Sequence, residues 1–187
     1  MNKKLFFSFL LISLLLSLTD CESKTGLKIK ESGADSLKVI SSFENYSFIP
    51  KKFSYKGENI SPEIEIRNIP EKTKSLLLIM EDPDAPAGKF IHWIVFNISP
   101  SDSFIPEGFS KNSFRLGNGI LQGLNSLGEY SYFGPHPPFG THRYFFKVFA
   151  LDNFLPEDST LTEEKILKIV ENHIISYGEL VGKFSKD

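Results

Sequence analysis

Two short segments combine rigid turn residues with titratable side chains. The first covers residues 81–93, and the second covers residues 132–144. Prolines and glycines surround an acidic group, several imidazoles and two phenols in these segments, which is chemistry suited to binding an anion or a metal ion. Both segments are flanked by apolar runs. We therefore expect them to form the walls of one small polar pocket.

The elements that must position the first segment are two strands. Residues 76–80 and 93–96 are continuous apolar runs of strand length, and they predict buried strands. Pro83 and Pro86 cannot donate a hydrogen bond to a sheet, so the chain should leave the sheet at Asp82. His92 then returns at the start of the next strand. Asp82 and His92 are expected at neighbouring strand ends.

The second segment predicts a stiff loop followed by a third strand. Prolines at 135, 137 and 138 and glycines at 134 and 140 exclude a helix or a central strand. The loop leads into the apolar run 144–151. Because side chains alternate along a strand, His142 and Tyr144 share one face. Arg143 lies on the opposite face, where it is expected to pair with an acidic neighbour.

The order and spacing of these motifs resemble the phosphatidylethanolamine-binding protein family, in its bacterial Raf kinase inhibitor-like branch. The motifs are Asp82-Pro83-Asp84-Ala85-Pro86, His92-Trp93, the loop 134–140 and His142-Arg143-Tyr144, and the likeness covers about residues 42 to 184. The resemblance implies a mainly β fold: a sandwich of two antiparallel sheets with peripheral helices, including a C-terminal helix.

The resemblance also implies a small cavity that accepts a phosphate-bearing or similar anionic head group, as in phospholipid binding. Carried over by position, the ligand-binding residues are Asp82, Pro86, His92, Tyr132, His142 and Tyr144. His136 falls where family members vary, and no role is assigned to it. No cofactor and no catalytic residue is predicted, so the protein is interpreted as a binding protein and not an enzyme.

The chemistry of the predicted site depends on Asp82. If its carboxylate accepts a hydrogen bond from His92 or His142, it fixes the tautomer and favours the charged imidazole, whose second N–H then faces the cavity. Such a donor suits phosphate. The residue pattern alone favours a simpler alternative, in which Asp82 caps a turn while His92 and Tyr144 are packing residues. The family resemblance reverses that preference.

Two other functions stay open as alternatives. A protein-interaction module that inhibits a protease or a kinase is the first, and a metal-dependent phosphoester hydrolase is the second. No metal ligand is assigned, because no His-x-x-x-His pair or acidic helix completes a metal site. No Gly-x-Ser-x-Gly motif is present either. A net charge of −2 gives no basic footprint, so nucleic acid is not an expected partner.

The amino terminus predicts export. Lys3 and Lys4 precede an apolar stretch, residues 5–18, which is shorter than the roughly 20 residues that span a bilayer. Residues 1–20 are therefore interpreted as a signal peptide, residues 21–38 as a flexible tether and residues 39–187 as the family domain. Cys21, the single cysteine, is the predicted lipidation site of a lipoprotein in the bacterial cell envelope, although Asp20 replaces the usual small residue. A soluble periplasmic or secreted protein is the alternative.

The remaining elements are predicted from local patterns. A strand and a turn at Pro50 are expected within residues 41–53, a strand over residues 60–66, and mostly loop from 98 to 116. Residues 160–175 predict a helix with a capping box of Thr160 and Glu163. Its apolar stripe includes His173, which is expected to be packed.

Overall fold

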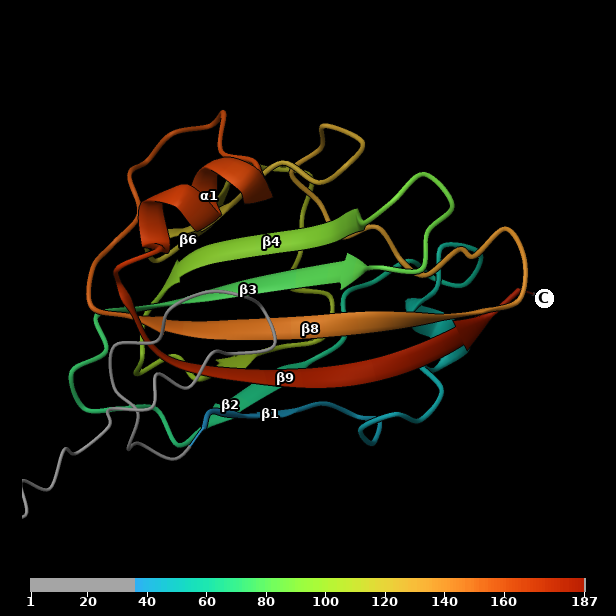
Figure 1. Cartoon of the computed structure of the whole chain (residues 1–187), viewed down its shortest axis with the longest axis horizontal. Helices are drawn as coiled ribbons and strands as arrows, with labels where there is room; N and C mark the ends of the chain where they lie inside the picture. Colours follow the sequence, from blue (N-terminus) through green and yellow to red (C-terminus); the bar gives the residue numbers. More distant parts are fainter. Residues whose placement is uncertain (1–35, 187) are drawn as a thin grey trace, which may run out of the picture.

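The computed structural model describes residues 36–186, which form two antiparallel sheets and one α-helix (Figure 1). The small sheet has the order β1-β2-β5, and the large sheet has the order β6-β7-β4-β3-β8-β9. The small-sheet strands are β1 (Lys38–Ile40), β2 (Ile64–Arg67) and β5 (Phe104–Ile105). The large-sheet strands are β3 (Ser75–Asp82), β4 (Phe90–Ile98), β6 (Arg115–Gly117), β7 (Ile120–Gln122), β8 (Thr141–Leu151) and β9 (Ile174–Ser185). The predicted mainly β, two-sheet fold is confirmed.

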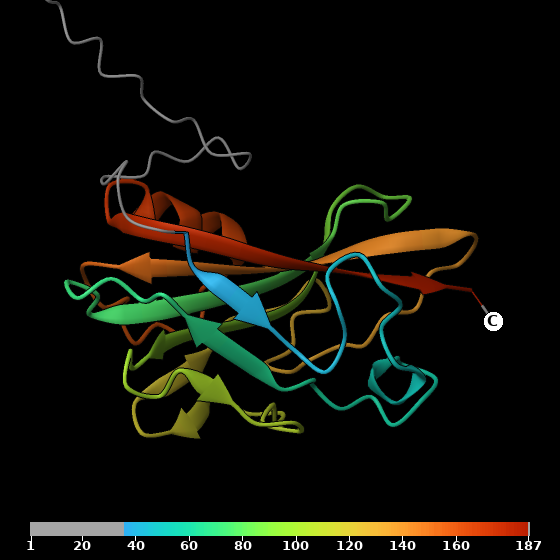
Figure 2. The same ribbon diagram turned by 90° about the horizontal axis from the view of Figure 1, so that it is seen from below.

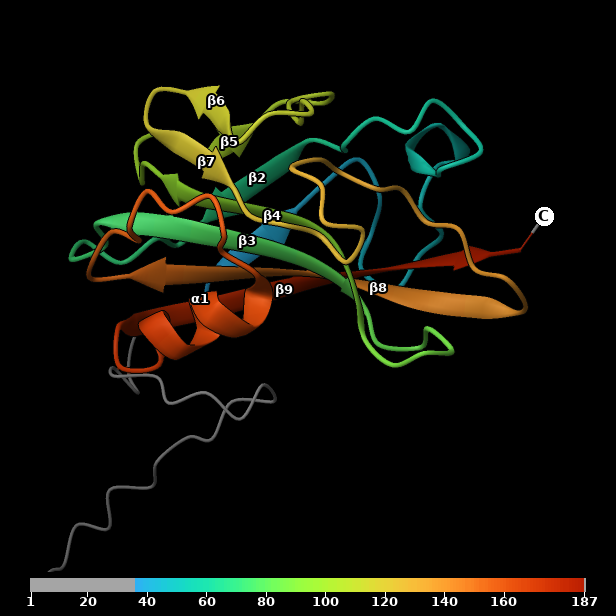
Figure 3. The same ribbon diagram turned by 90° about the horizontal axis from the view of Figure 1, so that it is seen from above.

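The two faces of the large sheet are covered by different elements. Figures 2 and 3 place α1 (Glu163–Val170) on one side of β3 and β8 and the small sheet on the other. Side chains of β3 alternate accordingly: Leu76 and Leu78 join the core beneath the small sheet, while Leu77 joins the cluster that contains Ile166 of α1. Both faces are buried, which explains why the run 76–80 is continuously apolar and not alternating.

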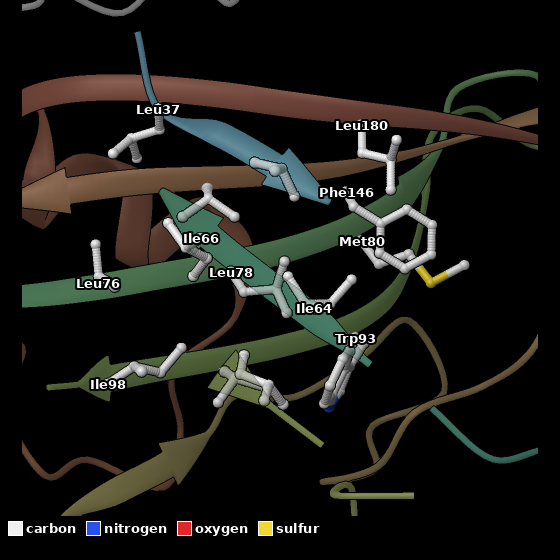
Figure 4. Packing of buried hydrophobic residues seen from close by; sticks show 14 of the residues in the cluster. Leu37, Ile64, Ile66, Leu76, Leu78, Met80, Trp93, Ile98, Phe146 and Leu180 are labelled. Carbon is white, nitrogen blue, oxygen red and sulfur yellow. The ribbon is translucent and has the colours of Figure 1, made fainter. Parts of the chain in front are cut away.

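The core between the sheets is built from aliphatic and aromatic side chains. Figure 4 shows Ile64 and Ile66 of the small sheet against Leu78, Met80 and other residues of the large sheet. Ile64, Leu78 and Met80 are completely buried. At about 1.5–3 kcal/mol for each fully buried large apolar side chain, this packing is the main term that holds the two layers together.

The expected C-terminal helix is shorter than predicted, and the chain continues into a strand. The helix α1 ends at Val170, and residues from Ile174 onward form β9, which pairs along the length of β8. Gly178 and Gly182 both lie within β9. A Cβ at Gly178 would lie 2.1 Å from the Leu37 carbonyl oxygen, so this glycine permits close crossing of two backbones.

The predicted helix cap and the role of His173 are also corrected. The N-cap is Thr162 and makes no side-chain hydrogen bond, so the capping box of Thr160 and Glu163 does not form. His173 follows the helix, and its Nδ1 lies 2.6 Å from Asp152 Oδ1. His173 therefore lies in the turn after the helix. Its side chain is partly exposed and contacts Asp152, so it is not part of a packed helical stripe.

The first strand lies earlier than expected. No strand of either sheet occurs within residues 41–53, whereas β1 occupies Lys38–Ile40 and the 3₁₀-helix η1 occupies Lys51–Phe53. Leu37 is 4% exposed and its N–H donates to the Tyr177 carbonyl. The predicted tether therefore extends too far, because Leu37 and Lys38 belong to the folded domain. The strand predicted over 60–66 is β2, and the segment 98–116 is mostly loop, as expected.

The predictions for the amino terminus lie largely outside the described residues. The signal peptide 1–20, the lipidation of Cys21 and most of the tether fall within residues 1–35. Within residues 36–186, no helix has both the length and the apolar character needed to cross a membrane.

Candidate functional site

Three neighbouring strands bring the predicted site residues to one end of the large sheet. In an antiparallel order β4-β3-β8, the end of β3 lies beside the starts of β4 and β8. Asp82 ends β3, His92 lies near the start of β4, and His142 and Tyr144 lie near the start of β8. Figure 3 shows the connecting loops gathered at this end, where β9 also ends. The predicted neighbourhood of Asp82 and His92 is confirmed.

A β-bulge positions His92. Met80 pairs with Trp93, but the next residue of β3, Glu81, pairs with Ile91, so His92 is an extra residue in β4. Such a bulge re-aims a side chain relative to a regular strand. Trp93 can therefore remain in the core between the sheets while His92, immediately before it, lines the cavity.

The Asp82 carboxylate is held through both oxygens. Its Oδ2 lies 2.7 Å from Nδ1 of His142, and its Oδ1 accepts the Asp84 backbone N–H at 2.8 Å. Asp82 thus caps the turn and also orients an imidazole. From the sequence these two roles are alternatives, and the structure shows both. Because a carboxylate accepts, Nδ1 of His142 carries the proton. The other ring nitrogen, Nε2, is buried and has no hydrogen-bond partner.

His92 is held differently from the prediction. Its Nδ1 lies 2.5 Å from the Phe133 carbonyl oxygen, which can only accept, so this nitrogen carries the proton. Burial lowers the pKa of His92 to about 4, against smaller opposing effects of the Phe133 carbonyl and Asp82. His92 is therefore neutral at pH 7, and its Nε2 is a hydrogen-bond acceptor. Of the two histidines considered as partners of Asp82, His142 takes that role and His92 does not.

Tyr144 contributes a hydroxyl without a partner. The side chain is completely buried, and its ring meets that of His92 edge-on with centroids 5.2 Å apart. Burial raises the pKa of Tyr144, and the nearby charge of Asp82 raises it further. The hydroxyl is therefore protonated at physiological pH. It has no partner with hydrogen-bonding geometry in the described structure.

These groups line a cavity of about 140 Å³. Its lining residues are Asp82, Ala85, Pro86, Phe90, His92, Phe133, His136, Pro138, His142 and Tyr144. Five of the six predicted residues are brought together here. Sequence reasoning assigned no role to His136 and did not single out Ala85, Phe90, Phe133 or Pro138. All of these except Phe90 lie in or beside the motifs, so their position in the sequence could have identified them as lining residues.

Tyr132 does not line this cavity, in contrast to the prediction. Its hydroxyl donates to the Phe53 carbonyl at 2.8 Å, and its ring packs edge-on against Trp93. The side chain therefore points into the core between the sheets. Tyr132 anchors the loop through this hydrogen bond and is not one of the residues that line the cavity.

The proline turn is clamped to β8 by an ion pair. Arg143 donates from Nε and Nη2 to the two oxygens of Asp84, at 2.9 and 2.6 Å, and its backbone N–H also donates to this carboxylate. Arg143 holds the pKa of Asp84 at about 2. The predicted pairing of Arg143 with an acidic residue is confirmed. Asp84 does not line the cavity, so only Asp82 of these two aspartates faces it.

The opposite wall is fixed by close backbone packing. A Cβ at Gly134 would lie 2.3 Å from the Phe53 carbonyl oxygen, so only glycine fits there. The Gly134 N–H donates to Asn59 Oδ1, and the Tyr55 N–H donates to the Pro135 carbonyl. These contacts join the proline loop to the segment after η1. The loop therefore holds the Phe133 carbonyl rigidly against His92.

No group of three or more His, Cys, Asp or Glu side chains within residues 36–186 is arranged to hold a metal ion. In the cavity, both Asp82 oxygens and the Nδ1 atoms of His92 and His142 already have protein partners. Among the buried lining side chains, the atoms left for a ligand are Nε2 of His92, Nε2 of His142 and the Tyr144 hydroxyl, and the exposed His136 also lines the cavity. This arrangement can bind a small polar group that forms hydrogen bonds with the buried end of the cavity.

Comparison with known proteins gives consistent matches. A family model described as phosphatidylethanolamine-binding protein matches residues 39–185. A UPF0098 protein of Pyrococcus abyssi is 43% identical over 157 residues, covering 82% of this chain and 88% of the relative. A UPF0098 protein of Archaeoglobus fulgidus is 44% identical over 153 residues, and this chain covers only 52% of its length.

Two crystal structures share the fold. A phosphatidylethanolamine-binding protein homologue from Chlamydia trachomatis is 39% identical with a TM-score of 0.75, and the match covers 82% of this chain and all of that one. YbcL of E. coli, described as a new member of the mammalian phosphatidylethanolamine-binding protein family, is 27% identical with a TM-score of 0.75. This match also covers 82% of this chain and all of YbcL. None of these names carries a catalytic activity.

Proposed function

Because the chain belongs to the phosphatidylethanolamine-binding protein family, we propose that it is a binding protein whose cavity accepts a small anionic, phosphate-bearing head group. One observation carries this proposal. Two buried polar atoms, His142 Nε2 and Tyr144 Oη, have no partner in the described structure, and both residues line the same cavity. Buried polar groups are normally paired, so an unpaired set in a cavity marks a place for a ligand.

The energetics favour a ligand at this place. Leaving a buried polar group unpaired costs about 1–3 kcal/mol, so a ligand that pairs both atoms gains hydrogen bonds without first breaking any within the protein. The groups are also preorganised: Asp82 orients His142, and the proline loop orients His92. Preorganisation lowers the ordering cost of binding.

The cavity size limits the ligand to a small head group. Its volume of about 140 Å³ compares with a liquid volume of ~30 Å³ per water, which leaves room for about five non-hydrogen atoms. A tetrahedral phosphate has that size. Pro86 and Pro138 are solvent-exposed lining residues, so the rest of a larger ligand extends outward past them.

Titration of the purified protein with inorganic phosphate and with phosphoethanolamine tests this proposal. Saturable chemical shift changes at the ring protons of His92 and His142 are expected, and the changes at His92 should disappear in a His142→Ala variant. The matched control is His173→Gln, because His173 is a partly exposed histidine paired with Asp152, which does not line the cavity. Histidine chemical shifts that stay unchanged with millimolar concentrations of either anion would contradict an anion site.

We further propose that the protein is exported and held at a membrane of the cell envelope through a lipid on Cys21. The support is the apolar stretch of residues 5–18 directly before this single cysteine. Mass spectrometry of the protein from a bacterial membrane fraction should find a lipid-modified amino terminus at Cys21. A Cys21→Ser variant should move to the soluble fraction. Recovery of unmodified, full-length wild-type protein would contradict lipidation.

A further inference from the structure

A second concave space adjoins the cavity beside the proline loop. Its volume is about 290 Å³, against about 140 Å³ for the cavity. His136 and Pro138 line both spaces, so the two are neighbours that share a wall. We call this larger space the outer pocket. A ligand whose head group lies in the cavity can extend across these two residues into the outer pocket.

The side chains around the outer pocket give it a positive charge. Lys56 and Lys186 line it, and none of its lining residues is acidic. Both lysines are exposed, and neither side chain makes an ion pair with a carboxylate of residues 36–186. Lys52 and Lys147, by contrast, each pair with a glutamate. The two ammonium groups of the outer pocket are therefore available to a ligand.

Backbone hydrogen bonds fix the two lysines at the two ends of the proline loop. The N–H of Tyr55, which precedes Lys56, donates to the Pro135 carbonyl at 3.1 Å. The Lys186 N–H donates to the Gly140 carbonyl at 2.9 Å. The stiff loop between these carbonyls therefore holds both lysine backbones in place before a ligand arrives. Such preorganisation lowers the ordering cost of binding.

The other polar groups of the outer pocket are secondary donors. Ser54 Oγ donates to the Lys51 carbonyl at 2.8 Å, and Ser185 Oγ lies 2.8 Å from Thr141 Oγ1. These hydroxyls are already engaged within the protein. The His136 ring, which lies between the two spaces, has at least one N–H in either protonation state. Lysine ammonium groups bind phosphate as point charges, so they dominate the chemistry of the outer pocket.

We propose that the outer pocket is a second anion subsite and that the protein binds molecules carrying two phosphate groups. One phosphate lies in the cavity, and the second lies between Lys56 and Lys186. The linker between the phosphates passes over His136 and Pro138. Phosphomonoesters and phosphodiesters both qualify, because each carries a negative charge. The inference rests on the proposed function and extends its ligand class.

The expected gain follows from the exposure of the lysines. Ion pairs at exposed sites are individually weak, so two of them should raise the affinity by about two- to thirtyfold over a matched ligand with one phosphate. Salt should reduce this ratio, because the Debye length falls from about 10 Å at ~0.1 M to about 3 Å at ~1 M.

A series of soluble probes tests the inference on the purified protein. Calorimetry near neutral pH compares the bisphosphates of linear diols, from ethane-1,2-diol to hexane-1,6-diol, with the monophosphates of the corresponding alcohols. The series covers a range of phosphate separations, and only separations that match the two subsites gain from both. At least one bisphosphate should bind more tightly than its monophosphate by the stated factor, and the ratio should shrink at high salt.

A double variant assigns the gain to the outer pocket. Lys56→Gln/Lys186→Gln should bring the best bisphosphate down to the affinity of its monophosphate, which is the internal reference in each variant. The matched control is Lys38→Gln/Lys74→Gln, which removes the same charge. Both control lysines are exposed, and neither lines the cavity or the outer pocket. The control should keep the full gain.

Vesicles distinguish the two possible sources of such a ligand. A cardiolipin head group joins two phosphodiesters through one glycerol, whereas phosphatidylglycerol has a single phosphodiester. Tighter binding to cardiolipin vesicles than to phosphatidylglycerol vesicles of equal phosphate content would support the inference with a lipid as the source. Equal binding to both vesicles, together with the gain for soluble bisphosphates, would support it with a soluble compound as the source.

The outcomes separate this inference from the proposed function. Bisphosphates that bind no better than monophosphates at every length would overturn the second subsite and leave the anion site in the cavity. A gain that survives in Lys56→Gln/Lys186→Gln, or that the control loses equally, would overturn the assignment to the outer pocket. Absence of binding by every probe would overturn both proposals.

Discussion

Removing one hydroxyl from Tyr144 or from Tyr132 should change the protein in opposite ways. Both side chains are buried, and both belong to the segment around the proline loop. The Tyr132 hydroxyl donates to the Phe53 carbonyl at 2.8 Å, whereas the Tyr144 hydroxyl has no partner in the described structure. A tyrosine to phenylalanine substitution at each position therefore compares a satisfied hydroxyl with an unsatisfied one.

The magnitudes follow from the partners. Tyr132→Phe leaves the buried Phe53 carbonyl without its donor, so the free energy of unfolding should fall by about 1–3 kcal/mol. Tyr144→Phe removes an unpaired polar group, and the free energy of unfolding should stay equal or rise by up to ~1 kcal/mol. A hydrogen bond from Tyr144 to a phosphate is worth about 1.5–3 kcal/mol, so Tyr144→Phe should weaken phosphate binding by about tenfold to a hundredfold.

Urea denaturation followed by tryptophan fluorescence measures the first effect, because Trp93 is the single tryptophan and is completely buried. Calorimetric titration with phosphate measures the second. A loss of stability in Tyr144→Phe equal to that in Tyr132→Phe would refute the assignment of an unpaired hydroxyl. Unchanged phosphate affinity in Tyr144→Phe would refute its contact with the ligand.

Three other perturbations have calculable outcomes. Gln122→Leu should lower the free energy of unfolding by at least about 3 kcal/mol in urea, because the two N–H groups of the buried amide are shared among three backbone carbonyls and its oxygen accepts from Trp93. The folded-state pKa of His92, about 4, lies below its ordinary 6.5, so the unfolded chain binds more protons between these values and stability should rise with pH across this window. The rise is about 3 kcal/mol at ~1.36 kcal/mol per pKa unit, and thermal unfolding of His92→Asn should lack it. The pKa of Asp84, about 2, lies below its ordinary 3.8, so its pairing contributes stability above pH 4 that is lost as pH falls to 2. Arg143→Gln should remove that loss, which amounts to less than ~1 kcal/mol because the Arg143 side chain is 51% exposed, and acid titration of both proteins measures it.

Local chain chemistry predicted much of the scaffold of the site. The apolar run 76–80, the prolines after Asp82 and the rigid loop before His142 all act through short-range preferences of the backbone. These preferences placed the strand ends correctly and put His142 and Tyr144 on one face. The local pattern extended the helix to residue 175 and did not predict β9, in which Gly178 is required by the crossing backbone at Leu37, far away in sequence.

The direction of individual side chains depended on distant partners. His92 faces the cavity because β4 bulges against Met80 and Glu81, and Tyr132 faces the core because the Phe53 carbonyl accepts its hydroxyl. The residue types next to His92 and Tyr132 in the chain indicate neither the bulge nor the carbonyl acceptor. The predicted role of Tyr132 in the cavity was wrong for this reason.

The amino-acid sequence by itself determined the strands that carry Asp82, His92 and His142 and the turns that end them, since these follow from side-chain type and spacing along the chain. Its motifs also showed the resemblance to the family, and that resemblance implied the two-sheet fold. The tertiary structure alone decided which nitrogen of each imidazole carries the proton and which polar atoms stay unpaired. A ring nitrogen carries its proton where a folded neighbour accepts it, and the Phe133 carbonyl and the Asp82 carboxylate reach the two rings only after the sheet and the loop have assembled.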